Sequence, residues 1–425
     1  MKYILMAALC CSLLTTKLQA QTPVVFTLEE CVQSAISHNK KVKVAQLDID
    51  ASNTAAQGGR LNALPDIQGS VIGAYIGKPL NNIFPEVVGG ASVSIIQPIY
   101  TGGKIALGNK LLNKAVDIAQ EQKLLTDADI TLDVEKAYWT VVQLKQKVIL
   151  SEKFEQLVSV FYQDLNDAYE AGLSYKNDLL RLGVAHNEAL LNIRKAKDGV
   201  IMSKLALSQL IGQSGNTDYD VSDSLNKMYR LHHELRVKQE LIKRPELRML
   251  EMALDAQALE RKMIKSELLP TVGLLGMGSL SIGKNVDFTT SNNTFATYLG
   301  VLNVSIPIFD WGRNAKKVKE HDLKTQITRL RLEEAKEFVD LEIQQAWLTL
   351  GQSIKQIELA EQSLQQAEEN LKLAQDRFEA GTIVAKDVQE AQVLWQQAYS
   401  NVIDAKVLFN INEAIFKRTI GRKNC

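Results

Sequence analysis

Three acidic side chains stand out as groups that could control the passage of ions. Asp387 and Glu390 are three residues apart, so in a helix both carboxylates can face one side. Asp178 takes the place of Asp387 in an internal repeat of the chain, and Lys386 adds a cation beside the pair. Carboxylates gathered in a ring around a narrow opening favour cations and are closed by them. The same acids could instead only stabilise helix starts through the macrodipole, and both interpretations stay open here.

Other kinds of chemistry find little support in the sequence. No nucleophile–base pair, pair of catalytic acids or set of metal ligands stands out, so we predict no enzyme, no cofactor and no metal site. The five histidines include His232 and His233, which lack partners at metal-ligand spacing. Forty-nine basic residues balance forty-nine acidic ones, so nothing predicts a nucleic-acid partner.

The first twenty residues have the pattern of an export signal. Lys2 precedes an apolar run from Ile4 to Leu14, and Ala20 stands at the expected cleavage position. Downstream, no stretch reaches the ~18 consecutive apolar residues that a membrane-spanning helix needs. Only Cys31 and Cys425 then remain, too few for a disulfide framework. We therefore expect an exported chain that stays in the periplasm or enters a membrane as strands.

The chain contains two copies of one pattern. A shift of 209 residues places Glu379-Ala380-Gly381 over Glu170-Ala171-Gly172. Upstream the shift is 205, which places Leu269-Pro270 over Leu64-Pro65. These matches predict a signal peptide at 1–20, a first repeat at 21–212, a linker at 213–233, a second repeat at 234–421 and a tail at 422–425.

Proline placement predicts which segments are helical, because a proline inside a helix costs ~3 kcal/mol. No proline lies between 99 and 244 or after 307. We expect continuous helices over 104–170 and 313–379, each ~100 Å long. Along the second of these, large apolar residues recur every seven positions with small residues three places later, as in coiled-coil packing. Shorter helices are expected over 27–63, 175–211, 235–268 and 384–420.

Between Pro65 and Pro98, and again between Pro270 and Pro307, the sequence predicts a β-hairpin. The expected strands cover about 67–76 and 91–98 in the first repeat, and about 272–282 and 295–306 in the second. Their charges are confined to the loops, and each run approaches the ~9–11 residues of a membrane-spanning strand. Tyr100, Phe309 and Trp311 cluster at one end, as interfacial aromatics do. A soluble hairpin packed on helices is the alternative.

Four strands cannot close a barrel, and an open sheet edge in hydrocarbon leaves unpaired backbone groups. If the strands enter a membrane, the chain must therefore combine with copies of itself. Three copies would supply twelve strands, and the long helices would continue the barrel as a tube.

The sequence resembles the TolC-like outer-membrane factor family over essentially the whole mature chain. The resemblance rests on the two-fold repeat and on the Leu-Pro before each hairpin. Its most specific parts are YEAGLSYKND at 169–178 and FEAGTIVAKD at 378–387. The fold it implies is mainly α with a small β part: two tandem repeats of helix, β-hairpin, long helix and helix. Three chains would form a twelve-stranded β-barrel continued by an α-helical barrel.

The resemblance also implies a function. It identifies a homotrimeric exit duct in the outer membrane of a Gram-negative bacterium, in contact with outer-membrane lipid. The duct would receive substrates from a periplasmic adaptor and an inner-membrane pump of the RND or ABC type, in efflux or type I secretion. An exported coiled-coil scaffold without a pore is the alternative, and the transported substrate cannot be predicted.

Residues of the family's periplasmic end can be placed on this sequence. Asp387 and Glu390 match acids that line the closed aperture, and Asp178 matches an acid that holds it shut. Phe378 and Ile383 stand where the family has a tyrosine and an arginine, which puts its hydrogen-bond network in doubt; Lys386 is the substitute we consider. The tip turns around Gly172 and Gly381 are expected to meet the adaptor through Leu173, Ser174, Thr382 and Ile383.

Overall fold

The computed structural model describes residues 24–222, 225, 244–287 and 289–421. The expected signal peptide, the C-terminal tail, most of the second half of the 213–233 linker and the His232–His233 pair lie outside the described residues. The prediction of a mainly helical chain with a smaller strand part is confirmed. No described helix combines the length and the apolar character that crossing a bilayer would require.

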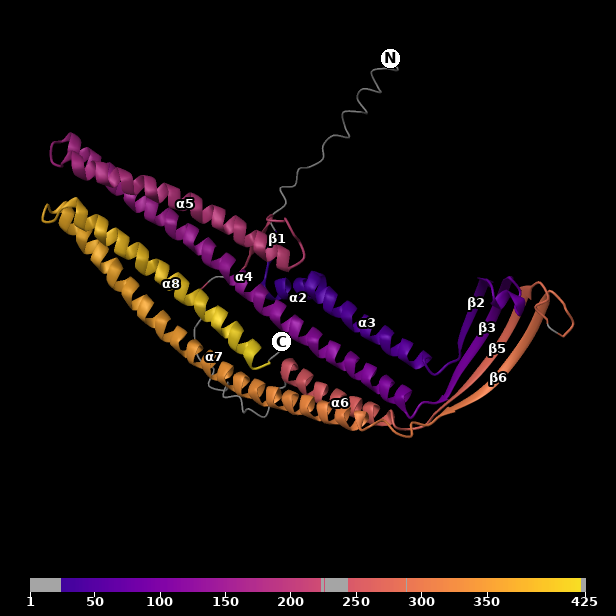
Figure 1. The fold of residues 1–425 in the computed structure, drawn as a ribbon. Coiled ribbons are helices and arrows are strands. Elements are labelled where there is room, and N and C mark those ends of the chain that lie inside the picture. Colours follow the sequence, from indigo (N-terminus) through magenta and orange to yellow (C-terminus); the bar gives the residue numbers. More distant parts are fainter. Residues whose placement is uncertain (1–23, 223–224, 226–243, 288, 422–425) are drawn as a thin grey trace, which may run out of the picture. The chain divides into compact units, whose positions relative to one another are not determined.

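Both repeats share the order helix, two strands, long helix, shorter helix (Figure 1). The first contains α2 (Leu28–His38), α3 (Lys40–Leu61), β2 (Asp66–Tyr75), the short 3-10 helix η1 (Leu80–Asn82), β3 (Val87–Tyr100), α4 (Lys104–Glu170) and α5 (Lys176–Leu210). The second contains α6 (Pro245–Ser266), β5 (Thr271–Gly283), β6 (Thr294–Ser305), α7 (Arg313–Glu379) and α8 (Ala385–Thr419). Two three-residue strands, β1 (Val24–Phe26) and β4 (Tyr219–Val221), lie outside this repeated order.

The first helical segment differs from the expected continuous helix over 27–63, because it breaks at Asn39. This residue has an extended backbone, with ψ of 134°. Its side-chain amide donates to the carbonyl of Leu210 at 2.8 Å, and the residue is only 7% exposed. The break is therefore caused by a contact with the end of α5, 171 residues away, which no local pattern reveals.

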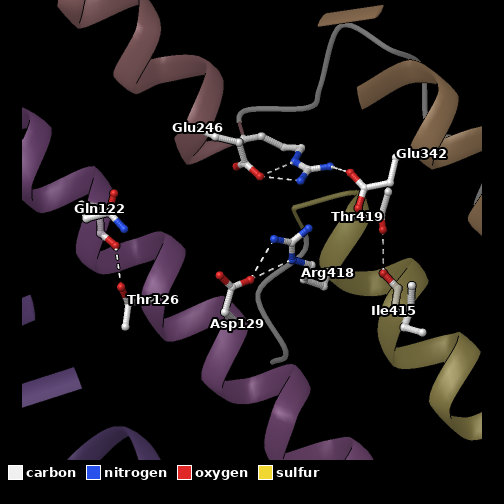
Figure 2. Close-up of polar contacts among 9 residues, drawn as sticks. Gln122, Thr126, Asp129, Glu246, Glu342, Ile415, Arg418 and Thr419 are labelled. Atoms are coloured by element: carbon white, nitrogen blue, oxygen red, sulfur yellow. Dashed lines mark hydrogen bonds and ion pairs between the residues drawn. The ribbon is translucent and has the colours of Figure 1, made fainter. Parts of the chain in front are cut away.

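One compact unit contains the described parts of Met1–Lys40, Ala128–Arg236 and Ile343–Cys425. In it α5 runs back along α4, and α8 runs back along α7 (Figure 1). Part of the seven-residue repeat predicted for α7 is buried here: Leu350, Ile357 and Leu371 are 3–7% exposed. Its other members, Ile343, Leu364 and Phe378, are half-buried. Polar contacts join α4 to α8 as well, including the ion pair of Arg418 with Asp129 at 2.8 Å (Figure 2).

A small clasp holds the start of the described chain to the linker in the same unit. β1 pairs in parallel with β4, and the hydroxyl of Tyr138 on α4 donates to the carbonyl of Phe26 at 3.3 Å. Lys145 Nζ lies 2.7 Å from Asp220 of β4. Burial opposes the ionisation of Asp220, but the hydrogen bonds from Lys145 and the Val221 backbone, together with the charges of Lys145 and Lys204, lower the pKa of this carboxyl. The described part of the linker is thus fixed to α4.

The other unit contains Lys41–Asp127 and the described part of Val237–Glu342. Its antiparallel sheet has the order β2-β3-β5-β6, and its helices are α3, α6 and the first parts of α4 and α7. Arg244, with a side chain 5% exposed, bonds to both Glu246 and Glu342. Burial alone would lower the pKa of this guanidinium, but the two glutamates raise it, so the buried cation is compensated.

Candidate functional site

The four-stranded sheet has one apolar face. Cross-strand partners lie on the same side of a sheet, so the pairing register shows which residues share a face. Val71 pairs with Ala91, Ala91 with Leu280, and Leu280 with Ala296. Several of its large side chains are exposed, among them Val71 at 85% and Tyr298 at 92%. Such a continuous apolar surface is expected on a face that meets lipid or another protein.

The opposite face carries a row of hydroxyl groups. Ser70, Ser92, Ser279 and Thr297 are consecutive cross-strand partners, one from each strand of the sheet. The hydroxyls of Ser70 and Ser92 are 2.7 Å apart. The four strands hold no charged residue except Asp66, the first residue of β2. The same face also contains apolar side chains, among them Ile72 and Leu299, so it is mixed rather than fully polar. An apolar face opposite a face with a row of hydroxyl groups suits strands that border both lipid and water.

The two outer strands of this sheet leave their backbones unpaired on one side. β2 and β6 are the edges, because β3 and β5 lie between them. β2 has ten residues and β6 has twelve, so both edges are long. Long unpaired edges are sites at which another chain can add strands.

The predicted aromatics stand where the sheet meets the helices. Tyr100 ends β3, and Phe309 and Trp311 follow β6. The rings of Phe309 and Trp311 are 4.9 Å apart, edge to face, and they are 72% and 89% exposed. Trp311 has φ of +58°, whereas its repeat partner Gly102 has +66°. A bulky residue in this conformation costs about 1–2 kcal/mol, and an exposed ring kept at that cost indicates a role at a surface.

The turns at the far ends of the long helices are built alike in both repeats. Gly172 and Gly381 have φ of +74° and +70°. The amide of Leu173 donates to the carbonyl of Ala168 at 2.8 Å, and that of Thr382 to Arg377 at 2.9 Å. Each glycine amide also donates to the carbonyl three residues earlier, at 3.0 and 2.9 Å. Together these bonds form Schellman motifs, which end a helix with a left-handed residue. The expected positive φ of both glycines is thus observed.

The tips expose apolar side chains. Leu173 is 83% exposed, while Ser174 and Ile383 are half-buried and Thr382 is exposed. Sequence reasoning missed Tyr175, which is 80% exposed, and its repeat partner Val384, which is 61% exposed. The 209-residue shift that aligned the glycines also aligns these two and could have found them.

The predicted carboxylates lie just beyond these turns, and two of them form a hydrogen bond or an ion pair. An oxygen of Asp387 accepts from the backbone amide of Val384 at 3.3 Å, so Asp387 stabilises the start of α8. Glu390 forms an ion pair with Lys386 at 3.3 Å, with both side chains about 60% exposed. Asp178 is half-buried in the first turn of α5 and makes no side-chain hydrogen bond or ion pair with the other described residues. The structure does not join Asp178 to the other three.

Phe378 makes a contact that the sequence did not suggest. Its ring lies 5.1 Å from that of Phe161 on α4, edge to face. An apolar contact therefore joins the two repeats near the tips. Across the described residues, no group of three or more His, Cys, Asp or Glu side chains is placed to hold a metal ion.

The sequence profile of outer membrane efflux proteins matches residues 31–213 and 237–422. The chain belongs to the outer membrane efflux protein family. The family places it in the outer membrane of Gram-negative bacteria as an efflux channel. No curated protein sequence matches the chain.

Solved structures share the fold over nearly the whole chain. CusC, which forms a transmembrane channel, has a TM-score of 0.79 at 15% identity, with 95% of this chain and 94% of CusC covered. The CmeC outer membrane channel of Campylobacter jejuni has a TM-score of 0.75 at 17% identity, covering 93% and 85%. VceC, an outer membrane protein of Vibrio cholerae, has 0.74 at 15%, covering 93% and 96%. At these identities the likeness shows the fold.

The assignment of the two faces can be tested with a charge on each. Val93 and Ser92 are neighbours in the middle of β3 but point to opposite faces. Val93→Lys is expected to lower the yield of folded protein in the outer membrane, because a lysine facing lipid at mid-depth costs ~2–4 kcal/mol. Ser92→Lys, the matched control, is expected to fold with near-normal yield. Equal losses in the two variants, measured as heat-resistant folded protein, would show that the faces are assigned wrongly.

Proposed function

We propose that this efflux channel is a homotrimeric exit duct that carries substrates from an inner-membrane pump and a periplasmic adaptor to the outside. The observation that carries the proposal is the four-stranded sheet with one apolar face, no internal charge and two long open edges. In hydrocarbon such edges must be paired. β6 of one copy can pair with β2 of the next, and three copies give the twelve-stranded barrel.

A second feature supports self-association. On α7, Phe338, Leu341 and Leu348 are 61–65% exposed. By helical spacing they lie on the side opposite to the buried row that contains Leu350 and Ile357. A helix with apolar residues on two opposite sides is suited to packing between two neighbours. In the proposed trimer the second neighbour is a helix of the adjacent copy.

The long helices give the duct its reach. α4 and α7 have 67 residues each and extend directly from the sheet region to the tip turns. At 1.5 Å per residue each is about 100 Å long. We infer that the tips stand deep in the periplasm, where an adaptor bound to an RND or ABC pump can reach them. The pump supplies the energy, so the duct needs no cofactor.

We infer that the carboxylates near the tips form the gate. Three copies would place Asp387 and Glu390 in two rings of acids, with Lys386 partly neutralising Glu390. Asp178 is proposed to help hold the closed arrangement from the first repeat. The bond from the Val384 amide gives Asp387 a second, structural role.

The gate assignment predicts a change in conductance. Asp387→Asn with Glu390→Gln should raise the conductance of the reconstituted protein and abolish its block by multivalent cations, because the acid rings that bind them are gone. Asparagine keeps an oxygen for the Val384 amide, so the start of α8 is retained. Single-channel recording is the measurement.

The control removes two carboxylates elsewhere on the same hairpin. Glu368→Gln with Glu369→Gln changes the charge equally on an exposed part of α7 and should leave conductance and cation block unchanged. Identical behaviour of the two double variants would refute the gate.

We propose that the tip turns dock the adaptor through Leu173, Ser174, Thr382 and Ile383, with Gly172 and Gly381 shaping the turns. The exposed Tyr175 and Val384 belong to the same surface. Exposed apolar residues at the end of a long hairpin are suited to burial against a partner.

Docking can be tested by crosslinking in cells. In a Cys425→Ser background, a cysteine at Ser174 or Thr382 should crosslink to the adaptor. A cysteine at Ser363, exposed on α7 away from the turn, is the control and should not. An intact oligomer that gives no crosslink from either tip position would count against this docking surface.

A further inference from the structure

Basic side chains stand at all four places where a helix meets the sheet. Arg60 lies near the end of α3 and Lys104 begins α4. Lys262 and Lys265 lie near the end of α6, and Lys316 and Lys319 near the start of α7. We call these six residues the basic collar. All belong to one compact unit, and all except the half-buried Lys104 are exposed.

The bases of the collar lie outside ion-pair distance of any described acid, whereas the nearby acids other than Asp66 are paired or capped. None of the six forms an ion pair within the described part of the chain. In contrast, Glu267 pairs with Lys317 at 2.8 Å and Glu260 with His321 at 3.0 Å. Asp310 accepts from the backbone amides of Gly312 and Asn314, which lowers the pKa of its carboxyl. The collar therefore presents positive charge that this unit does not neutralise.

The collar lies directly beside the exposed aromatics. Lys104 follows Tyr100 by four residues, and Lys316 follows Trp311 by five. Lys104 is the first residue of α4 and Lys316 lies in the first turn of α7, so both charges stand at the start of the helix that follows the ring. Aromatic rings of this kind lie at the headgroup level of a membrane. The lysines are thus at the depth of the lipid phosphates if the sheet spans the bilayer.

The other end of the sheet has no such excess. The β2–β3 loop contains Lys78 and Glu86, and the β5–β6 loop contains Lys284 and Asp287. Glu86 accepts from the hydroxyl of Tyr75 at 2.9 Å, and Asp287 is held by Thr289 and Thr290. Positive charge is therefore concentrated at the helical end, although the whole chain is neutral.

Two of the collar residues are placed unfavourably with respect to the dipole of their own helix. α4 and α7 have no acidic residue in their first turns, which instead contain Lys104 and Lys316. The positive end of a helix disfavours cations, so these positions oppose the folded helix. At α7 the carboxylate of Asp310, which accepts from the Asn314 amide, already offsets this conflict. At α4, whose first turn has no acid, an anion outside the chain would remove it.

We propose that the basic collar binds the phosphate groups of anionic glycerophospholipids in the periplasmic leaflet of the outer membrane. The aromatic rings lie among the headgroups, and the lysines reach the phosphates from the water side. This inference rests on the proposed insertion of the sheet into the membrane. Each lysine near an anionic surface contributes roughly a five-fold gain in binding at low salt.

The test uses the full-length oligomer in nanodiscs of phosphatidylcholine with or without phosphatidylglycerol. Native mass spectrometry after release from the discs should show phosphatidylglycerol retained at least about tenfold over phosphatidylcholine. Raising the salt should reduce the preference, because exposed charges are screened. Lys265→Gln with Lys316→Gln and Lys319→Gln should remove it, and the matching arginine variant should keep it.

The control variant, Lys43→Gln with Lys195→Gln and Lys372→Gln, loses the same charge from exposed sites away from the collar and should keep the preference. A native protein without a preference, or a control that loses it too, would overturn the proposal. The proposal would also be overturned if the collar substitutions left the lipid preference unchanged and reduced only the binding of purified peptidoglycan. Channel conductance of the same nanodisc samples separates the cases: a protein that never inserts refutes the exit duct, whereas one that conducts without lipid preference refutes only the collar.

Discussion

The pairing of backbone hydrogen-bonding groups is the constraint on which the rest of this structure depends. Inside a membrane, each unpaired amide or carbonyl costs several kcal/mol, so a sheet there can have no free edge. The large sheet in the described part of the chain has four strands, with β2 and β6 at the edges. Its apolar face suits lipid and its hydroxyl row suits water, but a single sheet placed in a membrane would leave the backbone groups of both edges unpaired. The proposed trimer resolves the conflict by closing the edges between copies.

The same constraint accounts for the two-fold repeat and the helices. Each repeat contributes one hairpin and continues into a 67-residue helix, so in the proposed trimer the barrel wall and the helical tube are made by the same segments. The tube needs close packing between helices, which the small residues Ala346, Ala360 and Ala374 allow; each is 8–9% exposed. At the tips, a left-handed glycine reverses the chain in both repeats.

The hairpins, the long helices and the tip turns could be predicted from the sequence, because the residue patterns that specify them are local and occur in both repeats. Prolines marked the hairpins, seven-residue spacing marked the buried side of α7, and Gly172 and Gly381 marked the turns. The break at Asn39 could not be predicted, because it depends on a bond to Leu210. The hydroxyl row required the pairing register, since Ser70, Ser92, Ser279 and Thr297 are far apart in sequence. The contact of Phe161 with Phe378 likewise depends on how α4 and α7 pack.

The number of chains in the membrane-extracted particle is the most direct test of the central claim. Native mass spectrometry of the mature protein, released from mild detergent, should give a single species of three chains. Without detergent the protein should not remain in solution, because its apolar sheet face would be exposed to water. A stable monomer that needs no detergent would contradict the account, since a single copy leaves both edges of the sheet unpaired.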